Sequence, residues 1–172
     1  MKKKTKTILS YAAEGAAFVV LLLLFYAYQT NGLLPTGEQA APKLSATSLD
    51  GMSIDLSERS ASATLVYFFA PWCGVCAASS GNIEHLREIR SDSELDILMV
   101  ALDWQTTAEV QAYVDRHEIS VPVLLGNRQI ASDWNVYAFP TYYMLDSKQR
   151  IVRRDLGYST LAGLWWRSTW ID

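Results

Sequence analysis

The stretch that holds both cysteines of the chain reads Phe68-Phe69-Ala70-Pro71-Trp72-Cys73-Gly74-Val75-Cys76. It begins inside a β-branched and aromatic run, Thr64 to Ala70, which predicts a buried strand. An amphipathic pattern follows from about Cys73 to Arg90 and predicts a helix that begins at the cysteines. The first turn of a helix brings two such side chains together, and its free amides stabilise a thiolate. The pair can therefore open and close a disulfide.

The two cysteines have different predicted roles. Cys73 comes first, at the more exposed edge of the helix, and is the candidate nucleophile. Cys76 lies one turn further in and would attack to release a mixed disulfide. Two other interpretations stay open. An inert structural disulfide would close only a small ring and add little stability, and a metal site would need His85 and His117, which lack zinc-finger spacing, so no metal is predicted.

Charge is distributed unevenly along the 172 residues. The whole chain carries a formal net charge of −3, but the first 30 residues carry four lysines and one glutamate, and residues 31–172 therefore carry −6. An acidic domain lacks the basic face that nucleic acid requires. The composition excludes a nucleic-acid partner and fits one domain with an appendage.

The N-terminal segment predicts a membrane anchor. Lysines at residues 2, 3, 4 and 6 belong to a basic tail, residues 1–7, and residues 8–28 carry Glu14 as their only charge. As a helix these 21 positions span about 30 Å, the thickness of a hydrocarbon core. A cleaved signal peptide looks similar, but no A-x-A-like site follows, so an uncleaved anchor is favoured. The positive-inside rule leaves the tail in the cytoplasm and the rest outside, which in a bacterium is the periplasm, on a single-pass inner-membrane protein.

The remaining chain predicts a linker and one α/β domain. Residues 29–41 mix Gly, Pro, Thr and Gln and are predicted to be a tether, and residues 42–172 form the domain. The pattern predicts a hairpin across Asp50-Gly51, buried strands, intervening helices and a final helix capped by Ser159 that reaches Ile171. The expected strands cover residues 44–49, 52–56, 64–70, 95–102, 121–125, 142–145 and 151–156, and the helices cover 73–90, 106–117, 129–135 and 159–171. This alternation predicts a sandwich with a mixed sheet between helices.

A second motif, Phe139-Pro140-Thr141 before an apolar strand, gives the chain its resemblance. With the Trp72–Cys76 site it resembles the thioredoxin superfamily, which implies a thioredoxin-like fold. The resemblance also implies that Pro140 is a cis-proline against the cysteines and that Trp72 flanks the nucleophile. More narrowly the chain is similar to the membrane-tethered TlpA/ResA/DsbE-like group, and within it to the suppressor-of-copper-sensitivity protein D type. The supporting segments are Ala41-Pro42-Lys43-Leu44, Leu49-Asp50-Gly51-Met52, Val100-Ala101-Leu102-Asp103, Val121-Pro122-Val123-Leu124 and Leu164-Trp165-Trp166.

The resemblance implies a periplasmic protein-disulfide oxidoreductase that works without a cofactor, because the sulfurs carry the electrons. Relatives of this kind more often reduce protein disulfides and receive electrons from a membrane electron-transfer reductase. A disulfide-forming oxidant remains an alternative. So does a copper(I) carrier that uses the same thiols, although the four methionines are scattered. A redox-inert interaction domain is disfavoured by the intact cysteine pair.

Four positions depart from the family pattern. Many relatives carry an acid where this chain has Tyr67 or Ser79, so its thiolate is expected to depend on the helix terminus, on Asp103 or on another acid. Val75 replaces the usual proline before the second cysteine. Phe139 replaces a smaller residue before Pro140, and we expect it to form an apolar platform with Trp72 for a partner's backbone, with Pro140 and Thr141 beside it. The alternative is that Phe139 fills a gap in the core.

Overall fold

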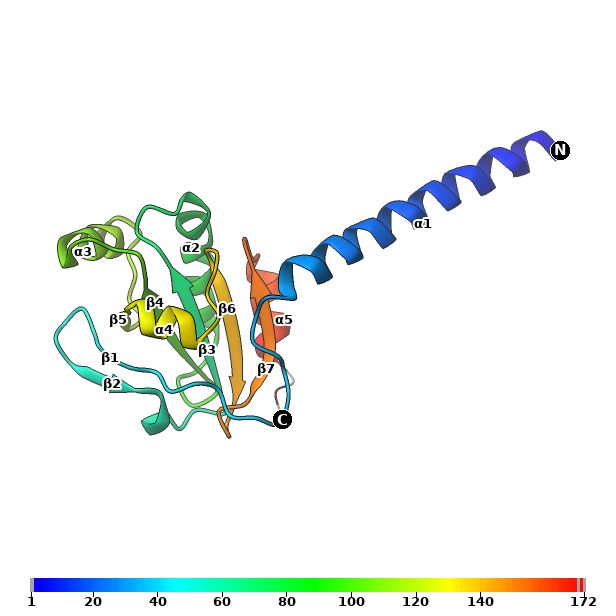
Figure 1. The fold of residues 1–172 in the computed structure, drawn as a ribbon. Helices are drawn as coiled ribbons and strands as arrows, with labels where there is room; N and C mark the ends of the chain where they lie inside the picture. The colour runs from blue at the N-terminus through cyan, green and yellow to red at the C-terminus, as the bar shows by residue number, and fades with distance from the viewer. Residues whose placement is uncertain (1, 170, 172) are drawn as a thin grey trace. The chain divides into compact units, whose positions relative to one another are not determined.

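In the computed structural model, which describes residues 2–169 and 171, strand β3 (Ala63–Phe69) lies at the centre of a five-stranded sheet (Figure 1). The strand order is β5-β4-β3-β6-β7. Strands β4 (Leu95–Ala101) and β5 (Val123–Leu125) run parallel to β3, whereas β6 (Thr141–Asp146) and β7 (Ile151–Leu156) form an antiparallel hairpin beside it. The sheet is mixed, as the sequence predicts.

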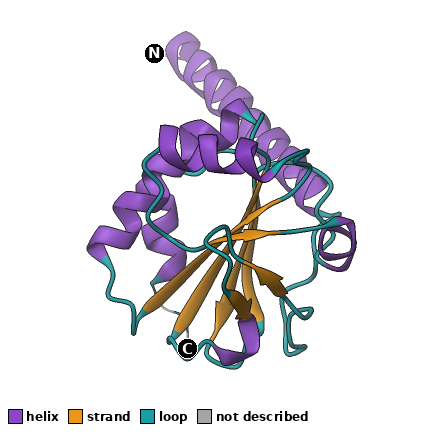
Figure 2. Cartoon of the chain, turned by 90° about the vertical axis from the view of Figure 1, so that its left-hand side faces the viewer, coloured by secondary structure: helices purple, strands orange, loops and turns teal. Residues whose placement is uncertain are grey.

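All seven side chains of β3 are buried, because both faces of the sheet are covered (Figure 2). On one face, which we call the redox face, Leu65, Tyr67 and Phe69 share a core cluster with both cysteines. Helices α2 (Gly74–Ile89), α3 (Thr107–Arg116) and α5 (Leu161–Ser168) contribute apolar side chains to this cluster.

The opposite face of the sheet, which we call the support face, is covered by different elements. Val66 and Phe68 of β3 pack there against helix α4 (Arg128–Asp133) and the segment from Leu33 to Leu56. That segment includes the two-stranded sheet of β1 (Ser45–Thr47) and β2 (Ser53–Asp55). The 3-10 helix η1 (Leu56–Glu58) follows β2 directly. The hairpin predicted across Asp50-Gly51 is confirmed.

The cap and the end of α5 differ from the prediction. Thr160, not Ser159, is the N-cap, because its hydroxyl accepts the Gly163 N–H at 3.1 Å. The Ser159 hydroxyl instead donates to Asp155 and accepts from Arg167. The helix ends at Ser168, so the expectation that it reaches Ile171 is wrong.

The predicted linker, residues 29–41, is ordered over much of its length. A compact unit begins at Leu33, which is buried in the support face. The Leu34 N–H donates to the Tyr143 hydroxyl at 3.1 Å. The N–H of Gly37 donates to the carbonyl of Ile151, the first residue of β7, and the N–H of Ala41 donates to the Gln149 carbonyl just before it. A segment without apolar periodicity thus takes its order from an edge strand with free backbone groups.

Helix α1 (Lys2–Thr30) forms the other compact unit. It includes the predicted anchor, residues 8–28, and continues to Thr30. Its window Ala13–Thr30 is long and apolar enough to cross a membrane, and a signal sequence has the same length and composition.

Candidate active site

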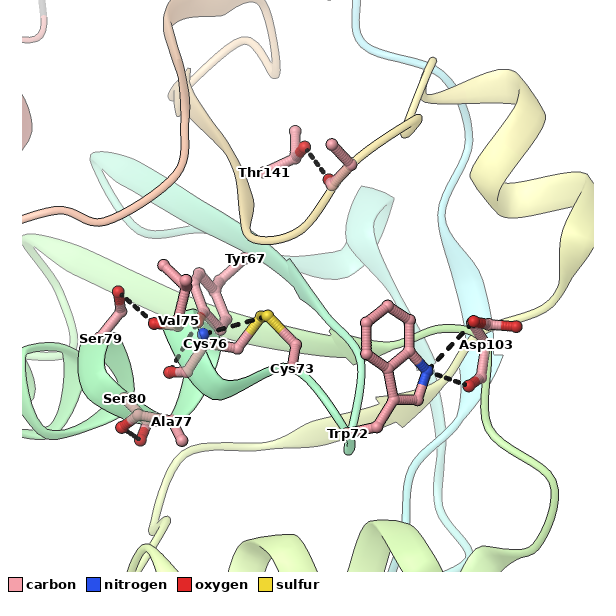
Figure 3. Close-up of a disulfide and its surroundings, with 11 residues drawn as sticks. Tyr67, Trp72, Cys73, Val75, Cys76, Ala77, Ser79, Ser80, Asp103 and Thr141 are labelled. Atoms are coloured by element: carbon pink, nitrogen blue, oxygen red, sulfur yellow. Dashed lines mark hydrogen bonds between the residues drawn. A yellow bond between two sulfur atoms is a disulfide. The ribbon is translucent and has the colours of Figure 1, made fainter.

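The cysteine pair lies where β3 passes into α2. Cys73 and Cys76 form a disulfide, and Cys73 is the N-cap of the 16-residue helix. The Cys76 N–H donates to the Cys73 sulfur at 3.1 Å (Figure 3). Cys73 is 7% exposed and Cys76 is fully buried. A thiolate at Cys73 would therefore meet a backbone donor and the positive end of the helix dipole.

Trp72 lies beside the disulfide with two thirds of its surface exposed (66%). Its indole N–H donates to both the carbonyl and the carboxylate oxygen of Asp103, each at 3.1 Å (Figure 3). Asp103 has a positive φ of 51°, a left-handed conformation that aspartate tolerates better than most residues. Its carboxylate thus contacts the indole that flanks the disulfide.

The predicted proline loop contacts Trp72 through Phe139. The Phe139–Pro140 peptide bond is cis, as the resemblance implies. The Phe139 ring meets the Trp72 ring edge-on, with centroids 5.9 Å apart, and it also packs against both core clusters. Phe139 therefore packs in the core and contacts Trp72, and its role as a platform for a partner's backbone stays a prediction.

Thr141 and Pro140 are partly occupied by contacts within the chain. Thr141 is fully buried, and its hydroxyl donates to the Ala138 carbonyl at 2.8 Å (Figure 3). The Pro140 carbonyl accepts the Gly157 N–H at 2.8 Å. A partner strand would have to pair with backbone groups that precede Pro140, and the Thr141 side chain is out of its reach.

Hydroxyl groups occupy the two positions where the family resemblance led us to look for an acid. The Tyr67 hydroxyl donates to the Cys76 carbonyl at 3.2 Å, and burial raises the pKa of Tyr67 well above its usual value. The Ser79 hydroxyl donates to the Val75 carbonyl at 3.0 Å. Neither side chain can act as a base at neutral pH, and both brace the first turn of α2.

A cavity of about 580 Å³ opens next to Phe139 and Asp103. Apolar and polar side chains both line it: Leu102, Asp103, Trp104, Gln105, Gly126, Asn127, Arg128, Ala131, Val136, Tyr137 and Phe139. At its edge the Trp104 indole donates to the Gly126 carbonyl at 3.0 Å. The sequence carries no signal for this cavity, because residues 102–105 and residues 126–139 line it from two separate parts of the chain.

Potential metal ligands do not gather in the part of the chain that the structure describes. No group of three or more His, Cys, Asp or Glu side chains lies close enough there to hold an ion. The His117 ring instead contacts the Tyr113 ring, with centroids 4.6 Å apart.

Comparison with known proteins identifies the family. The Redoxin family profile matches residues 35–162. The thioredoxin-like protein YneN of Bacillus subtilis is 30% identical over 145 residues, which cover 77% of this chain and 83% of YneN. The thiol-disulfide oxidoreductase ResA of Halalkalibacterium halodurans is 24% identical and covers 83% of each chain.

Solved structures share the fold. A thioredoxin-family thiol:disulfide interchange protein from Chlorobium tepidum has a TM-score of 0.68 at 19% identity and covers 76% of this chain and 94% of its own. StoA from Bacillus subtilis has a TM-score of 0.62 at 17% identity, and the match covers 74% of this chain and 96% of StoA. The finer likeness to the suppressor-of-copper-sensitivity protein D type stays a prediction. The chain belongs to the Redoxin family and is a thioredoxin-fold thiol–disulfide oxidoreductase of the TlpA/ResA/DsbE-like group.

Proposed function

We propose that the chain is a membrane-anchored oxidoreductase that reduces protein disulfides outside the cytoplasm, with Cys73 as the attacking thiol. One observation carries the proposal: Cys73 caps the N-terminus of α2 and is the more exposed of the two cysteines. Attack requires a thiolate that a partner can reach, and this position supplies both conditions. Cys76, buried one turn further in, is the resolving thiol.

The cycle transfers two electrons and two protons. The Cys73 thiolate attacks one sulfur of a substrate disulfide, a Cys73–substrate disulfide forms, and the other substrate sulfur leaves as a thiolate that takes up a proton. Cys76 then loses its proton and attacks the Cys73 sulfur. The second substrate thiol is released, and the Cys73–Cys76 disulfide remains. A dithiol donor, which we expect to be a membrane electron-transfer reductase, restores the reduced pair.

The anchor in this proposal is α1. Its apolar window follows a lysine-rich tail, which the positive-inside rule retains in the cytoplasm. A bacterial inner membrane would then carry the catalytic domain on its periplasmic side. The reducing direction is proposed from the likeness to tethered relatives. The Gly74-Val75 dipeptide between the cysteines does not by itself determine whether the pair reduces or oxidises its substrate.

An aromatic platform beside the disulfide is the proposed substrate contact. Trp72 and Phe139 present their rings at the mouth of the site, and the 580 Å³ cavity continues from Phe139 and Asp103. An extended segment of a partner would lie across these rings and direct its cysteine to Cys73.

Insulin reduction tests the function. The full chain is compared with Cys73→Ser, and we expect turnover by the wild type and none by the variant. The Cys73–Cys76 equilibrium with glutathione then gives the direction, since a potential near about −270 mV is that of a reductant and one near about −120 mV that of a strong oxidant. Copper loading without any disulfide exchange would contradict the proposal.

Replacement of Phe139 tests the platform. Phe139→Thr removes the ring contact with Trp72 at the edge of the site. We expect exchange with a peptide disulfide to slow by about tenfold while exchange with a small disulfide stays within twofold, because a peptide has side chains and backbone that the platform would contact. Equal peptide kinetics in the two proteins would assign Phe139 to the core alone.

A further inference from the structure

The buried half of the disulfide sets the chemical problem. When a thiolate attacks the more exposed Cys73 sulfur, the Cys73–Cys76 bond breaks and its electron pair leaves on the Cys76 sulfur. Cys76 is fully buried, so water does not solvate this anion where it forms. A buried anion without a hydrogen-bond donor is strongly disfavoured. The donors behind Cys76 therefore govern how readily the disulfide opens.

Five hydroxyl groups, which we call the hydroxyl cluster, occupy the redox face behind the first turns of α2. They belong to Tyr67, Tyr113, Tyr142, Ser79 and Ser80, and all five residues are buried. The Tyr67 and Tyr142 rings are in contact, with centroids 4.9 Å apart. The cluster combines side chains from β3, β6, α2 and α3.

Three of these hydroxyls already donate to backbone carbonyls of the helix that carries the cysteines. Tyr67 donates to Cys76, and the two serines donate to Val75 and Ala77 at 3.0 and 2.9 Å. The hydroxyls of Tyr113 and Tyr142, by contrast, lie near serine groups, Ser80 for Tyr113 and Ser79 and Ser159 for Tyr142, but make no hydrogen bond of normal geometry among the described residues. Buried hydroxyls in native proteins are nearly always partnered, so each of these two calls for an explanation.

The tyrosine hydroxyls are donors and not bases. Burial raises the pKa of Tyr113 to about 12. Burial also raises the pKa of Tyr142, an effect that the nearby hydroxyls of Ser79 and Ser159 reduce and the charge of Asp155 reinforces. The Asp155 carboxylate is engaged by Ser159 and by Arg167, at 3.0 and 2.7 Å.

We propose that the Tyr142 hydroxyl, unpartnered in the disulfide state, donates a hydrogen bond to the Cys76 sulfur when the disulfide opens. Its ring lies on Tyr67, whose own hydroxyl reaches the Cys76 carbonyl. Tyr113 contacts Phe69 and His117 instead, with centroids 4.7 and 4.6 Å away. The inference rests on Cys73 being the attacked sulfur, as in the proposed function.

The step balances with any small thiol as the reductant. The reductant thiolate forms a disulfide with Cys73, and the electron pair of the broken bond passes to Cys76. The Tyr142 hydroxyl donates to that thiolate and, once Cys76 has taken up a proton, to the sulfur of the resulting thiol. A second reductant thiolate then attacks the sulfur of the first reductant molecule in the mixed disulfide. Cys73 leaves as a thiolate and takes up a proton. In sum, the protein gains two electrons and two protons.

Tyr142→Phe tests the proposal, and Tyr113→Phe is its matched control, because both tyrosines are buried and both hydroxyls lack a partner. The full-length proteins in detergent are equilibrated with glutathione, and the disulfide fraction is read by thiol alkylation. We expect Tyr142→Phe to shift the equilibrium about tenfold toward the disulfide, which lowers the potential by about 30 mV. Attack by dithiothreitol should slow by a similar factor, and the control should stay within twofold of wild type.

Two results would overturn the proposal: an equilibrium within twofold of wild type for Tyr142→Phe, or an equal shift in Tyr113→Phe. Thermal unfolding checks that both variants fold. If Tyr142→Phe does not fold, Tyr142→Leu, which also lacks the hydroxyl, takes its place. The glutathione equilibrium is measurable whether or not the chain reduces insulin. A failure of the proposed function thus leaves this test intact.

Discussion

Tyr142 and Tyr143 are consecutive residues of β6 that point to opposite faces of the sheet, and their hydroxyls have opposite surroundings. On the support face, the Tyr143 hydroxyl donates to the Trp134 carbonyl at 2.8 Å and accepts the Leu34 N–H at 3.1 Å. On the redox face, the Tyr142 hydroxyl has no partner among the described residues. The support face thus gives its tyrosine hydroxyl two partners, whereas the redox face leaves a tyrosine hydroxyl that we propose serves Cys76.

The largest expected effect on stability comes from crowding the support face at Gly126. A Cβ there would lie 2.7 Å from Leu102 Cδ2, 2.8 Å from Val100 Cγ1 and 2.9 Å from the Ala101 carbonyl oxygen. Gly126→Ala should lower the free energy of unfolding by about 1–3 kcal/mol, the usual effect of overpacking. Denaturant unfolding measures the change, and a loss below about 0.5 kcal/mol would show that this face is loosely packed.

Tyr143→Phe should have the next largest effect. It leaves the partly buried Leu34 N–H and the Trp134 carbonyl without their partner, and should lower the free energy of unfolding by about 1–2 kcal/mol. The glutathione equilibrium should not move. Tyr142→Phe should do the reverse and change the equilibrium without lowering stability. Equal losses of stability in the two variants would contradict the proposed difference between the two tyrosine hydroxyls.

The smallest effect is a pH dependence at Asp146, where β6 ends. Burial by itself raises the pKa of Asp146, but hydrogen bonds from Arg150 and Lys148 outweigh it and hold the pKa below its usual 3.8. A folded-state pKa below the unfolded one adds stability that is fully present above pH 3.8 and is lost as the pH falls through the folded value. Between about pH 5 and pH 2, Asp146→Asn should therefore lose less stability than wild type. Parallel losses would contradict the assignment.

Local patterns made much of the fold predictable. The apolar runs and the helical spacing around the cysteines place the strand–helix junction within a residue or two, since burial and periodicity act locally there. The cis-proline follows only from the resemblance. The sequence pattern predicts the cap of α5 one residue early, because Ser159 and Thr160 are both good N-cap residues. Only the contacts of the Ser159 hydroxyl with Asp155 and Arg167 decide between them.

Long-range contacts made the rest unpredictable. The Leu33 carbonyl accepts a hydrogen bond from Arg154, 121 residues later in the chain, so the order of this segment has no local signature. The hydroxyl cluster has the same origin. Tyr67, Tyr113 and Tyr142 each look like ordinary apolar positions of a strand or helix, and only the assembled sheet brings them behind Cys76.

The most direct test of the account is the trapping of a mixed disulfide by single-cysteine variants. The difference in burial between the cysteines implies that Cys73 receives a partner's sulfur and that Cys76 resolves it. Incubated with a peptide disulfide and analysed by intact mass, Cys76→Ser should accumulate a stable adduct at Cys73, whereas Cys73→Ser should remain unmodified. Adducts that form at equal rates on the two variants would contradict the account.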